Sequence, residues 1–179
     1  MKGERNAQVY QVGPHLFGTS STIPHWKTEE LIPSLKPFLL SLDTYKEKEL
    51  KIAFSLAIQP ESETQEEDHA KYRSLIEFEW EGATCRISVI PDTDSYLITI
   101  LAPNDPKEYT AYFLYGFTKG VLFLHATEAD AFVLNNILMM IYAFNTACSD
   151  TVLMHASVIK KDGKGYLFQG KSGTGKSTH

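Results

Sequence analysis

The residues best suited to chemistry form the run G-K-S-G-T-G-K-S over residues 170–177. This run fits the phosphate-binding pattern G-x-x-x-x-G-K-[ST]. Its glycines allow successive backbone N–H groups to turn toward one point and surround a phosphate. Lys176 would add a positive charge beside the terminal phosphates, and the Ser177 hydroxyl would ligate Mg²⁺. The run therefore predicts a nucleoside triphosphate site, with ATP and Mg²⁺ as the expected cofactors.

The whole predicted site extends one residue beyond this run. We expect the nucleotide to contact Gly170, Lys171, Ser172, Gly173, Thr174, Gly175, Lys176, Ser177 and Thr178. Residues 165–169 (G-Y-L-F-Q) form a short β-prone run directly before the loop, and a helix beginning near Lys176 would aim its positive end at the phosphates. A flexible tail rich in Gly, Ser and Lys is the alternative interpretation of the same composition.

A second strand is expected just upstream of the loop. Residues 151–159 (T-V-L-M-H-A-S-V-I) are β-prone, and Asp162-Gly163 is a strong signal for a hairpin turn between this strand and the next. His155 lies within the upstream strand. A histidine in an apolar strand is often a satisfied core residue, so the pattern alone does not assign it a chemical role.

Residues 153–179 resemble the start of the nucleotide-binding domain in the HPr kinase/phosphorylase family and its serine-kinase-like relatives. The shared features are a His-bearing strand, a hairpin, a second strand and then G-x-S-G-x-G-K-S. The resemblance implies a fold related to ATP-dependent phosphoenolpyruvate carboxykinase and phosphoryl transfer from ATP to a protein or peptide hydroxyl. It also implies that His155 lies near the phosphates, as a catalytic residue.

The resemblance also sets an expectation about completeness. The family's acidic Mg²⁺ and base residues lie beyond the P-loop, and no Asp or Glu follows Asp162 in this sequence. We therefore expect the front part of a longer protein, inactive by itself, with a natural truncation as the alternative. Thr178 stands where HPr kinases usually carry an acidic residue, which favours a divergent relative.

Composition limits the classes of protein that the chain can belong to. With 179 residues, 43% hydrophobic and 22% charged, it suits a soluble protein with one ordinary domain, or one small domain plus a piece of another. The net charge of −5 argues against a general binder of nucleic acid or anionic membranes. Residues 1–6 lead into no apolar signal segment, and Cys85 and Cys148 lack the spacing of a metal site or disulfide framework. These features predict a cytoplasmic protein.

The first two thirds of the chain are predicted to be β-rich. Turn signals every eight to twelve residues over 72–124 indicate an antiparallel meander. Shorter strands are expected on both sides of Gly13-Pro14 and over 52–58. Thr28 opens a helical turn that resembles a capping box, which Pro33 and Pro37 cut short. The acidic residues 60–68 are expected to form a solvated connection; a cation- or partner-binding loop is the alternative.

A helix is predicted after the meander. Thr127 would cap it, it would run over residues 128–148, and residues 137–144 are apolar without interruption. Asn135 and Asn136 argue against a membrane span. A helix that is apolar all round must be buried on several sides. It would lie between the meander and the nucleotide domain, or against a second subunit of a homo-oligomer.

Together these features predict an α+β chain: an antiparallel β-rich accessory or substrate-recognition domain (1–126), a linking buried helix (127–150) and the start of a P-loop kinase-like domain (151–179), truncated. The leading functional hypothesis is the N-terminal part of an ATP-binding HPr kinase-like protein. The alternative is a non-catalytic protein- or peptide-binding module with a remnant or sensory P-loop. An ATPase or GTPase of another P-loop class is disfavoured by the His-bearing strand and hairpin upstream.

Overall fold

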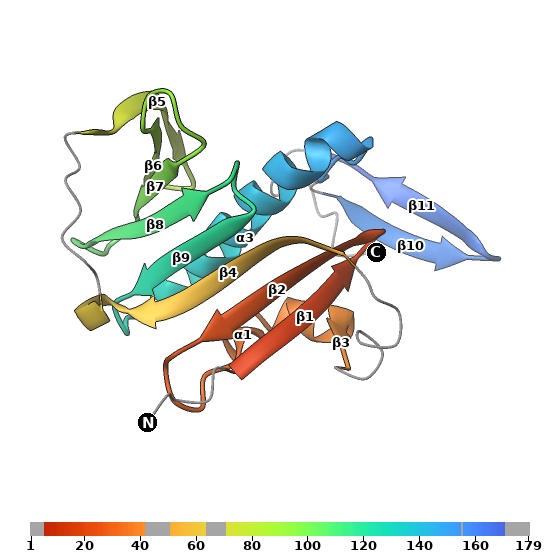
Figure 1. The fold of residues 1–179 in the computed structure, drawn as a ribbon. Helices are drawn as coiled ribbons and strands as arrows, with labels where there is room; N and C mark the ends of the chain where they lie inside the picture. The colour runs from red at the N-terminus through yellow and green to blue at the C-terminus, as the bar shows by residue number, and fades with distance from the viewer. Residues whose placement is uncertain (1–5, 42–50, 64–70, 155, 171–179) are drawn as a thin grey trace.

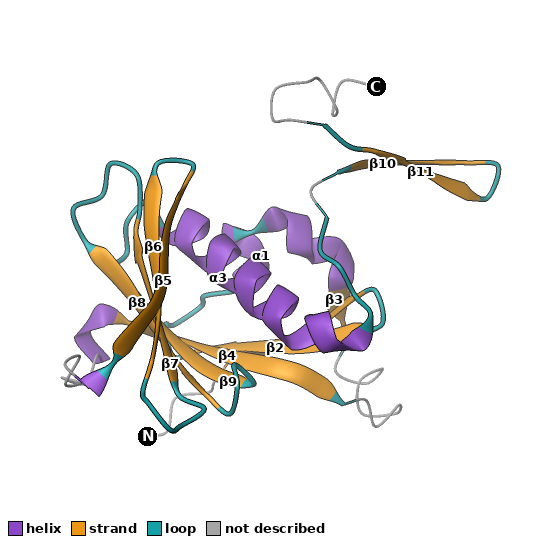
Figure 2. Ribbon diagram, turned by 90° about the horizontal axis from the view of Figure 1, so that it is seen from above, coloured by secondary structure: helices purple, strands orange, loops and turns teal. Residues whose placement is uncertain are grey.

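The protein is a mixed α+β structure in which a long helix lies along one face of a large mixed sheet (Figures 1 and 2). The computed structural model describes residues 6–41, 51–63, 71–154 and 156–170. The sheet contains β1 (Asn6–Val12), β2 (His15–Ser21), β3 (Leu39–Leu40), β4 (Ile52–Pro60), β5 (Arg73–Trp80), β6 (Ala83–Val89), β7 (Tyr96–Leu101), β8 (Glu108–Leu114) and β9 (Lys119–Leu124).

The sheet joins two regions that look separate in the sequence. Its strand order is β3-β1-β2-β4-β9-β8-β7-β6-β5. Strands β5 to β9 form the predicted antiparallel meander, and β1 and β2 form the predicted N-terminal hairpin. Strand β4 lies between them and pairs in parallel with both β2 and β9. These two parallel pairings were not predicted, and they make the hairpin and the meander one continuous sheet.

The core lies between this sheet and helix α3 (Asp130–Thr146). Strand β4 contributes the buried residues Phe54, Leu56 and Ile58, which alternate along the strand as expected for one face of a sheet. Helix α3 is buried on several sides, as predicted, and Ile137 and Ile141 are at most 1% exposed. The same apolar cluster contains residues of β1, β2 and the meander, so α3 packs on the sheet as a whole.

The prolines limit helix formation after β2 as expected. Helix α1 (Thr28–Leu31) is one turn long and is followed by the 3₁₀ helix η1 (Pro33–Phe38). The predicted capping role of Thr28 is wrong. Lys27 is the N-cap residue and its side chain makes no capping hydrogen bond; the N–H of Thr28 donates instead to Gln8 Oε1 on β1 at 2.9 Å. The Thr28 side chain is instead buried, 2.7 Å from the Thr19 hydroxyl on β2, where it attaches α1 to the sheet.

Helix α3 begins at Asp130, later than predicted, and ends in the 3₁₀ turn η4 (Ala147–Ser149). Its N-cap residue is Ala129 and makes no side-chain cap hydrogen bond. The Thr127 hydroxyl still accepts the N–H of Ala129 at 3.1 Å. The Asp130 carboxylate accepts the N–H groups of His125 and Ala126, so it holds the preceding loop. These bonds keep residues 125–129 outside the helix.

By length and composition alone, the stretch from Asp130 to Ser149 could cross a membrane. In the folded protein, 44% of its most apolar 18 residues is buried. The core helices of soluble proteins can have the same length and composition. The buried side chains of α3 belong to one hydrophobic core with those of the sheet. The fold is compatible with a soluble protein. The cytoplasmic location stays a prediction.

A separate hairpin follows α3. Strands β10 (Ser157–Lys161) and β11 (Lys164–Phe168) pair only with each other among the described residues, and Figure 2 shows them apart from the main sheet. Asp162 and Gly163 have φ of 51° and 74°, the left-handed conformation that the Asp-Gly signal predicts. The first strand is shorter than expected, because residues 151–154 have no regular structure.

Candidate functional site

The hairpin leads directly to the predicted nucleotide site. Strand β11 ends at Phe168, and Gln169 and Gly170 continue the chain without regular structure. Gly170 is exposed and is the one residue of the predicted site within the described part of the chain. The others lie outside the described residues: Lys171, Ser172, Gly173, Thr174, Gly175, Lys176, Ser177, Thr178 and the candidate catalytic residue His155. Their roles, including the Mg²⁺ ligand Ser177, stay predictions.

The hairpin carries apolar side chains on both faces. Val158 lies opposite Leu167, and Ile159 lies opposite Tyr166 on the other face, because neighbouring positions of a strand point to opposite sides. Val158 is 63% exposed and Leu167 is 51% exposed. Strands with apolar residues on both faces are typical of sheets that are covered on both sides. The hairpin therefore has the composition of an interior element.

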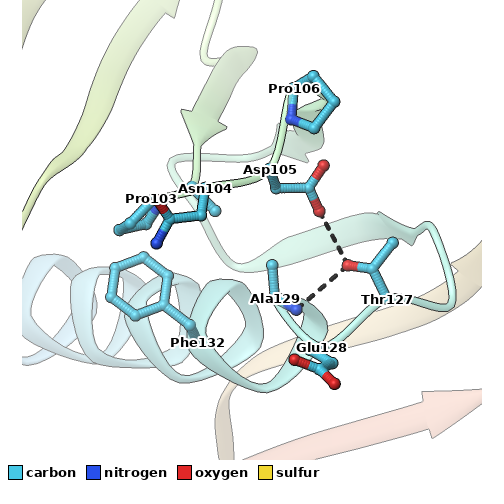
Figure 3. Close-up of a pocket in the computed structure, with 9 residues that line it drawn as sticks. Pro103, Asn104, Asp105, Pro106, Thr127, Glu128, Ala129 and Phe132 are labelled. Carbon is cyan, nitrogen blue, oxygen red and sulfur yellow. Dashed lines mark hydrogen bonds between the residues drawn. The ribbon is translucent and has the colours of Figure 1, made fainter.

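A cavity lies beside the start of α3 (Figure 3). It has a volume of about 560 Å³ and is lined by residues of the β7–β8 turn and of the loop before α3. The Thr127 hydroxyl donates to Asp105 Oδ2 at 2.9 Å, and Figure 3 shows this bond together with the bond from Ala129. Asp105 Oδ1 accepts the N–H of Lys107 at 3.0 Å. This backbone bond, with the Thr127 hydroxyl, holds the pKa of Asp105 below its ordinary value.

Tyr109 on β8 is the centre of the polar cluster behind this cavity. Its ring is buried, and its hydroxyl lies 2.6 Å from Thr127 Oγ1, 3.0 Å from Asp130 Oδ1 and 3.2 Å from Asp105 Oδ2. Burial raises the pKa of Tyr109 above its ordinary value, so the hydroxyl stays protonated and donates. Both carboxylates already accept hydrogen bonds from the protein, so the cluster fixes the loop to the sheet.

A second polar contact involves the acidic segment after β4. Glu61 begins the 3₁₀ turn η2 (Glu61–Glu63), and its Oε2 lies 2.8 Å from His125 Nδ1 and 3.2 Å from Lys107 Nζ. Hydrogen bonding with His125, and to a smaller extent with Lys107, holds the pKa of the Glu61 carboxyl below its ordinary value. Glu61 is 52% exposed, as expected for a solvated connection, but its contacts with His125 and Lys107 attach it to the sheet region. Residues 64–68 of the segment, and the charged stretch 43–50, lie outside the described residues.

The described residues offer little for metal chemistry. No group of three or more His, Cys, Asp or Glu side chains within them is arranged to hold a metal ion. Cys85 is buried beside Met140, and burial raises the pKa of its thiol to about 11, which keeps it protonated and inert. Thr127 was predicted only as a helix cap, and the polar cluster that it forms with Asp105, Tyr109 and Asp130 was not predicted, since no motif spacing marks these residues.

A comparison of the chain with known protein families, with curated proteins and with solved structures found no match.

Proposed function

We propose that this chain carries the ATP-binding P-loop of an HPr kinase-like protein that transfers the γ-phosphoryl group of ATP to a protein or peptide hydroxyl. The single observation that carries the proposal is the run G-K-S-G-T-G-K-S at 170–177, which follows strand β11 directly. A phosphate-binding loop needs a strand before it, and β11 meets that requirement.

The hairpin supports the same proposal. Strands β10 and β11 expose apolar side chains on both faces, as expected for strands that a layered nucleotide-binding domain covers. The sheet and α3 would then serve as the accessory or substrate-recognition part. In this arrangement Lys176 neutralises the terminal phosphates, Ser177 ligates Mg²⁺, and His155 lies near the phosphates.

Loss of the P-loop lysine tests the nucleotide site. Lys176→Ala should weaken binding of a fluorescent ATP analogue with Mg²⁺ by more than about tenfold, or about 1.4 kcal/mol, because a charge at the phosphates is lost. Lys164→Ala removes the same charge from the exposed start of β11, outside the predicted site, and is the matched control. Equal affinities of Lys176→Ala and the unaltered chain would contradict the assignment.

Transfer is a separate step with a separate test. The acceptor hydroxyl oxygen forms a bond to the γ-phosphorus, the bond from that phosphorus to ADP breaks, and the hydroxyl proton leaves to a base. In the complete protein, with the acidic residues that the family carries beyond the P-loop, labelled γ-phosphate should appear on a serine-containing acceptor, and His155→Ala should slow its appearance while ATP still binds. Binding with no transfer to any acceptor would favour a sensor.

A non-catalytic peptide-binding module is the second candidate, favoured by the sheet edge at β5. This strand is last in the sheet order, and Leu75, Ile76 and Trp80 on it are 50%, 52% and 41% exposed. An extended peptide can add to such an edge as a further strand. Peptide binding that Ile76→Lys abolishes, without ATP turnover, would favour this candidate over the kinase.

A further inference from the structure

A second cavity, of about 630 Å³, lies at the other end of α3. The parallel strands β2, β4 and β9 all begin there, and the end of α3 with η4 closes it. Its polar side chains come from these elements and from the residues that precede β4 and β9. They include His15, Lys51, Ser55, Thr118, Lys119 and Asn145.

The parallel pairing brings the basic residues together. His15 begins β2, Lys51 directly precedes β4, and Lys119 begins β9. Leu16 pairs with Ile52, so β2 and β4 begin side by side, and Ser55 pairs with Lys119, so β9 begins beside the fourth residue of β4. Among the described residues, no Asp or Glu lines this cavity. The described residues that line the cavity therefore carry positive charge, in a chain whose net charge is −5.

Hydrogen bonds fix the walls of the cavity. His15 Nε2 lies 2.7 Å from the Thr151 hydroxyl, and the Asn145 amide donates to the carbonyls of Phe117 and Ile141. The Thr118 hydroxyl donates to the carbonyl of Tyr115 at 2.9 Å. Lys119 Nζ lies 5.8 Å from the centre of the Tyr115 ring, the outer limit of a cation–π contact. The frame is therefore rigid, whereas this ammonium group is held only weakly.

A purely structural role for the lysines must be weighed against ligand binding. Basic residues near a helix C-terminus stabilise it by about 0.3–1 kcal/mol. Side chains of α3, however, already bind carbonyls of its last turns: Asn145 binds Ile141 O, and the Thr146 hydroxyl binds Tyr142 O at 2.8 Å. Moreover, lysines that only balance the partial negative charge at the C-terminus of α3 would not require a cavity. The cavity beside them is large enough for a small metabolite.

We propose that this cavity binds a small molecule through a compact anionic group, a phosphoryl or a carboxylate, with Lys51 and Lys119 as its counter-charges. The inference rests on the sheet and α3 and is independent of the nucleotide site. The bond between His15 and Thr151 joins the cavity wall to the segment that continues toward β10.

The test uses the Lys176→Ala chain, so that phosphate bound at the P-loop does not contribute. Inorganic phosphate and citrate, each against chloride at equal ionic strength, should raise the melting temperature in a saturable way, because a ligand that binds only the folded state stabilises it. The anion with the larger shift identifies the preferred group. Adding Lys51→Met and Lys119→Met should weaken that anion's binding, measured by calorimetry, by more than about tenfold.

Lys36→Met is the matched control, since Lys36 is exposed on η1 and does not line the cavity. It should bind the anion as the parent chain does. The proposal is overturned if neither anion gives a saturable shift. It is also overturned if the double variant melts at a lower temperature but still binds the anion with unchanged affinity, since the lysines would then only balance the helix end.

Discussion

The sheet body and the C-terminal hairpin are built from similar local signals but differ in their surroundings. In the body, Leu56, Ile98 and Leu122 are completely buried beneath α3 and neighbouring strands. In the hairpin, Val158 and Leu167 are more than half exposed, although their strands pair in full register. Local pairing thus forms both elements, and tertiary burial stabilises only the first. An isolated two-stranded hairpin is marginal in water, so we infer that β10–β11 depends on what covers it.

The largest predicted difference between the two regions comes from truncating a core side chain. Ile141→Ala in α3 should lower the free energy of unfolding by about 2–5 kcal/mol, because it leaves a cavity at a fully buried site. Leu167→Ala in the hairpin should change it by less than about 0.5 kcal/mol. Urea unfolding measures both values. A comparable loss from Leu167→Ala would mean that the hairpin belongs to the cooperative core.

A pair of strand glycines sharpens the comparison. A Cβ at Gly120 on β9 would lie 2.3 Å from Phe113 Cε1, so Gly120→Ala should destabilise by about 1–3 kcal/mol through overpacking. At Gly165 on β11 the nearest atom, Val158 Cγ1, is 4.0 Å away, so Gly165→Ala should be tolerated. Thermal unfolding compares the two alanine variants. Equal melting temperatures would contradict the close packing of β8 and β9.

A pair of tyrosines tests the polar cluster. Tyr109→Phe should cost about 1–2 kcal/mol, because the hydroxyl that contacts Asp105, Asp130 and Thr127 is lost from a buried site. Tyr166→Phe removes a hydroxyl from the exposed hairpin and is the control. If the two variants unfold at the same urea concentration, the cluster does not hold the loop before α3.

The smallest predicted effect is a dependence on acid. The folded protein holds the pKa of Asp105 below its ordinary value of 3.8, so this carboxylate stabilises the fold above that pH. Its contribution is lost as the pH falls through the lowered folded-state pKa. Asp105→Asn should therefore flatten the fall in melting temperature between about pH 5 and pH 3. Asp162→Asn in the hairpin turn is the control, and an equally flat profile for it would refute this source of acid sensitivity.

The elements whose signals are local were predictable from the sequence. Gly13-Pro14 marks the first hairpin, Asp162-Gly163 marks the last one, and the regular turn signals mark the meander. The role of β4 was not predictable, because a short apolar strand carries no information about parallel partners distant in the sequence. The start of α3 was misplaced because Asp130 binds the N–H groups of His125 and Ala126, a tertiary arrangement.

The two candidate sites, the P-loop and the basic cavity, also differ in how far the sequence predicts them. The P-loop motif is readable from the sequence because its residues are consecutive and their spacing follows from phosphate geometry. The basic cavity is not, since His15, Lys51 and Lys119 line one cavity only because β2, β4 and β9 pair in parallel. The contact between Glu61 and His125 likewise joins distant segments. Sequence patterns therefore identify sites built by one segment, and the fold is needed for sites built by several.

The most direct test of the central claim is hydrogen exchange with and without ATP and Mg²⁺. Without nucleotide, the amides of β10 and β11 should exchange faster than those of β4 and β7, because the hairpin lacks tertiary burial. Adding ATP and Mg²⁺ should slow exchange in the hairpin and over 170–178 in the unaltered chain, but not in Lys176→Ala. Identical exchange with and without nucleotide in the unaltered chain would contradict the proposal that this hairpin leads into an ATP site.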